Sequence, residues 1–307
     1  MARIERIEDL AATDAGRGTA RLASGVRGSL ADAADALAGV VPRPVVIVTG
    51  FLVGAARHPT CETDGPIGAV QLAAALGGLG SPVAICTDAP CAPAVRSLLA
   101  RLGVAAEVHV AAGPGGPGTP VDELVRGYRA AGVGAVVAVE RVGPSADGHP
   151  RDMRGRSLAR HTAPVHRVLN GGPWCSIAVG DGGNELGMGA LAADVVAASV
   201  AHGEAIACTV GCDHLVVAGT SNWGAVALVA ALAVARPDRR GVLTPWLDPD
   251  RLRPAVDAAC RAGELVDGVT ARPAPTVDGL DWADYAAVAG HIGALAAPPP
   301  GAMPVPA

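Results

Sequence analysis

Short apolar runs alternate with amphipathic segments along most of this chain. Three runs of strand length are continuously apolar, at 45–48, 83–86 and 135–139, and a fourth, at 175–179, is apolar except for Ser176. Unbroken apolar runs of this length are typical of parallel strands that are buried on both faces. Segments with helical periodicity lie between and after these runs, at 67–76, 92–102, 121–131 and 191–202. The pattern predicts an α/β fold, an open, mostly parallel sheet with helices on both faces, in a single large domain.

The remaining segments complete this expected layout. Residues 1–40 predict two amphipathic helical pieces with a break near 14–18. Further strands are expected at 107–110, 205–210 and 214–218, and further helices at 225–235, 249–262 and 282–295. Pro and Ala dominate the last residues, which predicts a disordered tail. The chain therefore divides into an N-terminal helical segment (1–40), an α/β domain (41–296) and a tail (297–307).

Polar side chains come directly after the apolar runs. They are Thr49 with Glu62 and Asp64, then Asp88, Glu140 and Asp181. In open α/β sheets, ligands bind beyond the carboxyl ends of the strands, so we expect these groups to form one acidic rim.

The segment VGDGGNELGMG at 179–189 concentrates glycines and acids after a predicted strand. Glycines there allow positive φ and close approach of a ligand, and the N–H groups of a helix start favour an anion. The segment lacks the third glycine of a dinucleotide loop and the Lys-Ser/Thr ending of a phosphate loop. The alternative interpretation is a tight βα turn, capped by Asp181, that binds nothing.

Composition and charge exclude several function classes. The chain has 307 residues and a formal net charge of −5, with no long basic run, which argues against a nucleic-acid partner. The longest strongly apolar run, 225–235, is too short to span a bilayer, and the N-terminus lacks an apolar signal core. Seven scattered cysteines form no CxxC pair. We therefore expect a cytoplasmic protein with a small-molecule substrate and no membrane or nucleic-acid partner.

A set of motifs, in order along the chain, resembles the D-glutamate cyclase family. The motifs are TGF at 49–51, ETDGPIGA at 62–69, ER at 140–141, ADG at 146–148, MRG at 153–155, GDGGNELGMG at 180–189 and TSNWG at 220–224. The match runs from about residue 3 to 290. The chain departs from the family pattern around 143–152, where His149-Pro150-Arg151-Asp152 follow Asp147-Gly148.

The resemblance implies a lyase that converts D-glutamate to 5-oxo-D-proline and water. Such a reaction needs a base for the α-amine, an acid for the departing oxygen and donors for the tetrahedral oxyanion. We assign Asp181 and Glu185 as acid and base candidates, with Asn184 beside them. The backbone N–H groups of Gly182, Gly183 or Asn184 are the predicted oxyanion donors.

The remaining candidates are expected to hold the substrate. Glu62, Asp64 and Glu140 would hold the ammonium group or a metal, and Arg154 and Asn222 would hold the α-carboxylate. Further substrate contacts are expected from Thr49, Asp147 and Ser221. Cys61 is a weaker candidate nucleophile, because the neighbouring acids would raise its pKa.

Several alternatives stay open from the sequence. No cofactor is required, although Glu62, Asp64, Glu140 and Asp181 are hard oxygen ligands that suit Mg²⁺ or Mn²⁺. A competing class is a non-catalytic module that binds an acidic metabolite. A third is a lyase or hydrolase for a related amino acid, using the altered 143–152 loop. The preference for the D isomer rests on the family resemblance alone.

Overall fold

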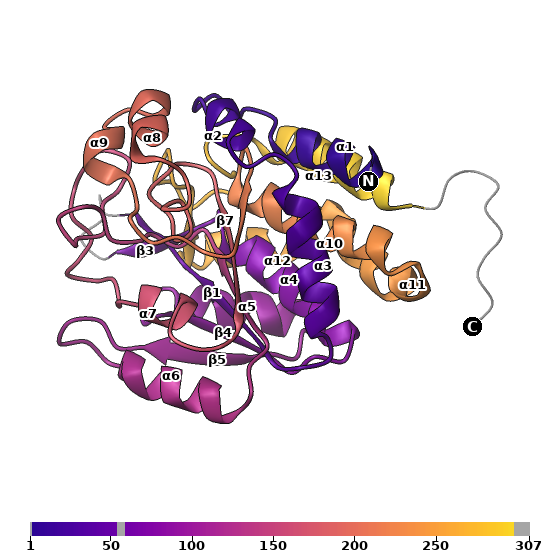
Figure 1. Ribbon diagram of the computed structural model, residues 1–307, viewed down its shortest axis with the longest axis horizontal. Helices are drawn as coiled ribbons and strands as arrows, with labels where there is room; N and C mark the ends of the chain where they lie inside the picture. The colour runs from indigo at the N-terminus through magenta and orange to yellow at the C-terminus, as the bar shows by residue number, and fades with distance from the viewer. Residues whose placement is uncertain (1, 54–58, 298–307) are drawn as a thin grey trace.

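The structure is a computed structural model, which describes residues 2–53 and 59–297 (Figure 1). Its central sheet has six strands: β1 (Val45–Thr49), β4 (Val83–Asp88), β5 (Glu107–Ala111), β6 (Ala135–Val139), β7 (Cys175–Gly180) and β8 (His214–Val217). They lie in the order β5-β4-β1-β6-β7-β8, and every neighbouring pair is parallel. The predicted α/β fold with an open parallel sheet is confirmed.

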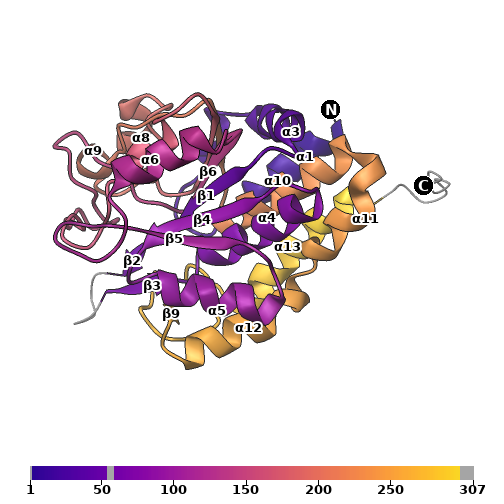
Figure 2. The ribbon, with the colours of Figure 1, turned by 90° about the horizontal axis from the view of Figure 1, so that it is seen from below.

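Helices cover both faces of this sheet (Figure 2). One face carries α1 (Ala2–Ala11), α3 (Ser29–Val40), α4 (Pro66–Gly78), α5 (Ala92–Leu102), α10 (Ser221–Ala235), α12 (Pro249–Arg261) and α13 (Trp282–Ala296). The other carries α2 (Ala20–Ser24), α6 (Val121–Ala130), α7 (His166–Leu169), α8 (Ala193–Ser199) and α9 (Gly203–Ile206). Alternate strand residues face opposite cores: Val45 and Ile47 one, Val46 and Val48 the other. That double burial explains why the strands are continuously apolar.

Helix α10 is the central element of the larger core. It is apolar all around because α1, α3, α4 and α13 surround it and leave almost none of its surface to water. Its small Ala and Val side chains let these helices approach closely. A short helix, α11 (Arg240–Leu243), and two 3₁₀ turns, Pro237–Arg239 and Thr244–Leu247, continue from its C-terminal end. Its N-terminal end lies at the site described below.

The strand order creates a switch point between β1 and β6. The chain moves outward from β1 to β4 and β5, then returns to place β6 on the other side of β1. The connections that leave β1 and β6 therefore diverge at the carboxyl edge of the sheet, where a crevice opens. A second, three-stranded sheet flanks this edge. It consists of β2 (Leu52–Val53), β3 (Thr60–Glu62) and β9 (Leu265–Val266), and Glu62 is the last residue of β3.

One predicted element was wrong. Residues 205–210 do not form a strand: Gly203–Ile206 is helix α9, and a loop without strand pairing follows it. The helix predicted at 191–202 is present in a shorter form, as α8 from Ala193 to Ser199, and it begins after the glycine-rich segment 180–189. The expected break near 14–18 is present, between α1 and α2. Of the predicted tail, 298–307 lie outside the described residues.

Within residues 2–53 and 59–297, no helix combines the length and the apolar character that crossing a lipid bilayer requires.

Candidate active site

A cavity of about 540 Å³ opens at the carboxyl edge of the sheet. Six carboxylates line it: Glu62, Glu140, Asp152, Asp181, Glu185 and Asp278. Phe51, Leu52 and Val53 contribute an apolar wall on another side. The cavity therefore joins the end of β6, the loop after β7 and the small flanking sheet, as the switch-point geometry leads us to expect.

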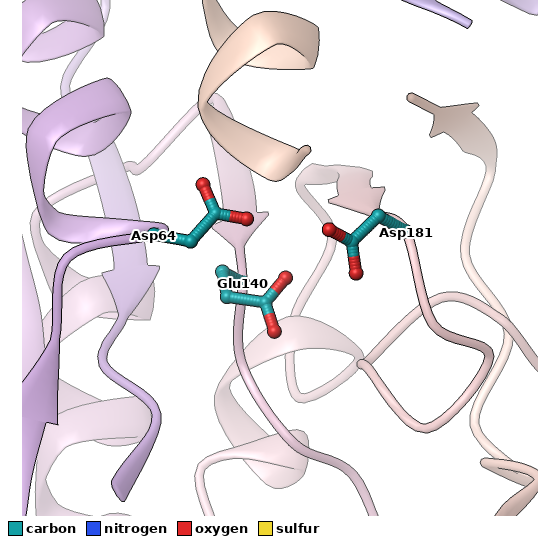
Figure 3. A group of neighbouring side chains, drawn as sticks. All are labelled: Asp64, Glu140 and Asp181. Atoms are coloured by element: carbon teal, nitrogen blue, oxygen red, sulfur yellow. The ribbon is translucent and has the colours of Figure 1, made fainter. Parts of the chain in front are cut away.

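Three carboxylates come together from distant parts of the chain beside this cavity (Figure 3). Asp64, Glu140 and Asp181 are buried, and one oxygen of each lies within 4.8 Å of the others. Asp64 precedes α4, Glu140 follows β6 and Asp181 follows β7. The acidic rim expected from the strand ends is therefore present for these three residues. Asp88 is not part of it, because its carboxylate forms a buried ion pair with Arg141.

The carboxylate of Asp64 caps the N-terminus of α10. Its two oxygens accept hydrogen bonds from the backbone N–H groups of Ser221 and Asn222, each at 2.8 Å. These N–H groups have no partner within the helix, and a negative charge there is favoured by the helix dipole. Asp64 does not line the cavity itself, so its main visible role is to fix α10 against the loop before α4.

Glu140 occupies a strained backbone position. Its φ is 44°, in the left-handed region that non-glycine residues rarely adopt. The adjacent Gly65 has φ 93°, and a Cβ atom there would lie 2.6 Å from the Cβ of Glu140. The hydroxyl of Ser221 donates to Glu140 Oε2 at 2.6 Å. Strain that the surrounding structure maintains is concentrated at functional sites, which marks Glu140 as a candidate for chemistry.

The glycine-rich loop uses its N–H groups internally. Gly182 N–H donates to Glu185 Oε1 at 2.7 Å, and Gly183 N–H donates to Glu185 Oε2 at 2.8 Å. The predicted oxyanion donors at Gly182 and Gly183 therefore already hold the Glu185 carboxylate. Asn184 donates its amide N–H to Arg151 O at 2.7 Å, whereas its buried Oδ1 atom has no partner among the described residues. That free acceptor belongs to a residue that lines the cavity.

Two residues that the sequence reasoning missed complete the site. The Arg17 guanidinium forms ion pairs with Asp181 and with Asp278, the latter at 2.7 Å. Arg17 comes from the break between α1 and α2, and Asp278 from a turn after β9. The sequence signals were weak: an arginine between two glycines, and an Asp-Gly pair before a polar turn. Nothing local to either residue indicates a partner more than 160 positions away.

Burial and mutual repulsion disfavour the ionised forms of these carboxylates. Burial raises the pKa of Asp181 well above its usual range, and Arg17 only partly opposes this. Burial, followed by the charge of Asp181, raises the pKa of Glu140 in the same direction. The pKa values of Glu62, Asp64 and Asp278 are also raised, first by burial. The protonated form of each group is therefore favoured more than it would be in water.

Several predicted site residues lie away from the cavity lining. Thr49 is fully buried below Gly65, and its hydroxyl has no partner among the described residues. Ser221 reaches the site only through Glu140. Asn222 Oδ1 accepts from Gly65 N–H and Gly68 N–H, and Nδ2 donates to Thr63 O, so both lone pairs of the oxygen and one of the two N–H donors are used.

Two further candidates, Asp147 and Arg154, lie on the loop 143–165, and only one of them lines the cavity. Asp147 lies outside the cavity lining; its half-exposed carboxylate pairs with Arg151 and accepts from His149 N–H. Arg154 does line the cavity, and its exposed side chain forms no ion pair within the described residues. Of the two, only Arg154 is placed to meet a ligand. Cys61 is fully buried, and burial raises its pKa well above the usual value, which disfavours a nucleophilic thiolate.

The ligand atoms of the carboxylate cluster decide whether it can hold a metal ion. Asp64, Glu140 and Asp181 offer hard oxygens at a spacing that a divalent ion can bridge. Each already has a partner, however: two backbone N–H groups for Asp64, a hydroxyl for Glu140 and Arg17 for Asp181. Carboxylate oxygens carry spare lone pairs, so the donor set fits a metal if Arg17 releases Asp181.

The fold and the site together define an α/β domain with a buried acidic cavity at the switch point of a parallel sheet. Comparison with known proteins narrows this class. The family model described as "D-glutamate cyclase-like, C-terminal" matches residues 7–292, and the chain belongs to this family.

One curated relative is "D-glutamate cyclase, mitochondrial" from Homo sapiens. It is 34% identical over 215 residues, which cover 62% of this chain and 33% of the human protein. The aligned region thus spans about a third of the length of that relative. The word mitochondrial belongs to the human protein's name; the cytoplasmic location expected for this chain stays a prediction.

Proposed function

We propose that this protein is a lyase that cyclises D-glutamate to 5-oxo-D-proline and water. The observation that carries the proposal is the family match over residues 7–292, together with the name of the human relative. The site supports it, because the cavity combines proton-carrying carboxylates with guanidinium groups that suit an acidic amino acid.

The substrate orientation follows from the charges around the cavity. Arg154, exposed and without an ion-pair partner in the described chain, receives the α-carboxylate at the mouth. The α-ammonium group lies against Glu62 and the free Oδ1 of Asn184. The side-chain carboxylate then extends toward Glu140 and Asp181. Holding the chain in this curled form can supply about 7–11 kcal/mol of the barrier reduction, because the reaction is intramolecular.

The reaction moves two protons from the ammonium nitrogen to the departing oxygen. One C–N bond forms, one C–O bond breaks, and the oxygen leaves as water. Glu140 is the proposed base, since its raised pKa suits proton removal from an amine and its Oε2 is oriented by Ser221. Asp181 is the proposed acid. Glu185 stays a candidate for either role, although two backbone N–H groups already hold its carboxylate.

A divalent metal is a second element of the proposal that needs its own test. Asp64, Glu140 and Asp181 would hold the ion, which would polarise the carboxyl group under attack. The proton transfers above use the chain's own residues in either case.

The experiment is to incubate the purified protein with D-glutamate and, separately, with L-glutamate, and to follow 5-oxoproline by chiral chromatography. Each reaction is run with and without EDTA, and the Glu140→Gln and Asp181→Asn variants are run beside the wild type. We expect product from the D isomer only, and a loss of at least about 100-fold in each variant. Loss of activity in EDTA, restored by Mg²⁺ or Mn²⁺, would support the metal.

One outcome would contradict the proposal, and a binding measurement divides it into two cases. If folded wild-type protein forms no product from either isomer, the cyclase assignment is wrong. Calorimetric binding of D-glutamate without turnover would then favour a non-catalytic binding module. If neither binding nor turnover occurs, the altered 143–152 loop directs the search to other acidic amino acids.

A further inference from the structure

Arg17 reaches the cavity from outside the central sheet. It belongs to residues 12–19, here called the N-terminal strap, which connect α1 to α2. The strap crosses the loop before α10, where Gly219 N–H donates to Ala11 O at 2.7 Å. Gly219 also allows a close approach by Thr13, since a Cβ atom at this glycine would collide with the Thr13 carbonyl. The strap is therefore fixed beside the rim that carries the acidic groups.

The strap itself is preformed around Asp14. One oxygen of this carboxylate, Oδ1, accepts from Gly16 N–H at 2.8 Å, Arg17 N–H at 2.9 Å and Gly18 N–H at 3.1 Å. Gly16 and Gly18 take the positive φ values, 92° and 79°, that this tight turn requires. The backbone of Arg17 is thus held before any ligand binds, which reduces the entropy lost when the guanidinium engages one.

Asp278 holds the guanidinium end of the same side chain. Arg17 Nη1 donates to Asp278 Oδ1 at 3.1 Å and Nη2 donates to Oδ2 at 2.7 Å, a paired geometry that fixes the plane of the fork. Asp278 itself has φ 54°, and the neighbouring Gly279 N–H donates to Asp267 Oδ2 at 2.8 Å. A buried residue kept in a strained conformation, whose carboxylate orients one arginine, is typical of a functional support.

The remaining donors of Arg17 are only partly used. Nη2 contacts Asp181 and, at 3.5 Å, Gly219 O, while Nε has no hydrogen-bond partner among the described residues. A guanidinium group offers five N–H donors in a planar arrangement, and Nε with Nη2 forms one of its forks. In that pair, Asp181 occupies Nη2 and leaves Nε without a partner. A ligand carboxylate could accept from both Nε and Nη2.

The charge of the cavity creates a need for this arginine. Besides Asp152, which pairs with Arg156, six carboxylates crowd the site: Glu62, Asp64, Glu140, Asp181, Glu185 and Asp278. Among the described cations that line the cavity, Arg17 has the most buried side chain, 22% exposed, whereas Arg156 is 48% exposed and paired with Asp152. A second carboxylate on a ligand would be repelled at this depth unless a guanidinium met it. The N–H groups of Gly182 and Gly183 cannot do so, because Glu185 uses them.

We infer that Arg17 binds the side-chain carboxylate of the substrate, the group under attack, and that Asp278 is the positioning residue that orients Arg17; this inference rests on the function proposed above. Nε and Nη2 pair with the substrate carboxylate as Asp181 leaves Nη2.

The test separates carboxylate recognition from turnover. Glutarate, a five-carbon dicarboxylate without an amine, cannot cyclise, and glutaramate replaces one of its carboxylates with a neutral amide. Calorimetric titration of both ligands measures the preference for the second charge. We expect the wild type to prefer glutarate by about 10-fold or more, and Arg17→Ala to lose that preference. Arg21→Gln, an exposed residue four positions along the chain, is the matched control and should keep it.

Kinetics with D-glutamate provide the second measurement. Arg17→Ala should lower kcat/KM by about 100-fold or more, and free guanidinium ion below denaturing concentrations should restore part of it. Arg17→Lys keeps the positive charge but loses the planar pair of N–H donors, so its kcat/KM should lie between those of the wild type and Arg17→Ala. Asp278→Asn should reduce the glutarate preference without a matching loss in melting temperature, which a merely structural role would not explain.

The outcomes distinguish this inference from the proposed function. If the wild type forms 5-oxoproline and Arg17→Ala keeps both activity and the glutarate preference, the inference is wrong and the cyclase proposal stands. If the wild type forms no product but its glutarate preference depends on Arg17, the cyclase proposal is wrong and carboxylate recognition by Arg17 stands.

Discussion

The hydroxyl of Ser221 donates a 2.6 Å hydrogen bond to Oε2 of Glu140, although 81 positions separate the two residues in the sequence. Ser221 opens α10 and Glu140 ends β6, so the bond joins the central helix of the core to the sheet at the site. It thereby holds the side chain of a backbone-strained glutamate that lines the cavity.

Replacement of Ser221 by alanine should shift the pH dependence of turnover. A donor to the ionised carboxylate stabilises that form, so its loss should raise the pKa of Glu140 further above its usual range. With Glu140 as base, the acidic limb of kcat/KM should move to higher pH by about one unit. Ser176→Ala, which removes a 2.9 Å bond to Asp213 away from the cavity, is the matched control. An unmoved limb in Ser221→Ala would assign the base to another residue.

Replacement of Gly65 by alanine should displace Glu140. The new methyl group would lie 2.6 Å from the Glu140 Cβ, and the φ of 93° strains any side chain there. A shift of about 1 Å in a reacting group can cost 100-fold, so kcat/KM should fall by about that factor. The control is Gly77→Ala, near the exposed C-terminal end of α4, the helix that begins directly after Gly65. The new methyl group at Gly77 meets no atom within 4 Å. It should stabilise the protein by about 1 kcal/mol in urea unfolding and keep full activity.

Replacement of Asn222 by alanine should act on stability first. The change leaves Gly65 N–H, Gly68 N–H and Thr63 O without their buried partner. Each buried unsatisfied group costs about 1–3 kcal/mol, so the free energy of unfolding should fall by about 3 kcal/mol or more. Asn170→Ala removes one bond from an exposed asparagine and should cost far less. A stable Asn222→Ala protein with weakened substrate binding would restore the predicted contact with the α-carboxylate.

Replacement of Glu62 by glutamine should change how stability depends on pH. Burial, then the charges of Asp278 and Asp64, raises the pKa of Glu62 well above its unfolded value of about 4.3. The native state therefore binds more protons than the unfolded chain above that pH. This contribution to stability is fully present below the unfolded pKa and is lost as pH rises through the folded pKa.

Melting temperatures of the wild type and Glu62→Gln, measured between pH 5 and pH 8.5, test this sign. The wild type should lose stability as the pH rises, and Glu62→Gln should lose less, because one buried charge no longer forms. Glu123→Gln removes an exposed carboxylate on α6 and should follow the wild type. A wild-type stability that rises over this range, or equal slopes in all three proteins, would contradict the raised pKa of Glu62.

The sequence by itself determined the sheet, most helices and part of the rim. Hydrophobic periodicity is local, because each buried strand or helix face must be apolar whatever it packs against. That is why β6 and α5 have the bounds expected of them, and why Glu140 and Asp181 could be placed at one edge of the sheet before their contacts were known. The failure at 205–210 has the same origin, since a short apolar run fits a strand and a buried helical turn equally well.

Only the tertiary structure decided which polar groups meet. Hydrogen bonds and ion pairs are chosen by spatial proximity, and 261 positions separate Arg17 from Asp278, while 158 separate Asp64 from Asn222. The sequence therefore missed Arg17 and Asp278, and it could not tell that Asp64 and Asn222 satisfy buried backbone groups. It also predicted free N–H groups at Gly182 and Gly183, because nothing in the motif shows that the Glu185 side chain folds back onto them. Burial of a polar group demands a partner, but only the fold supplies its identity.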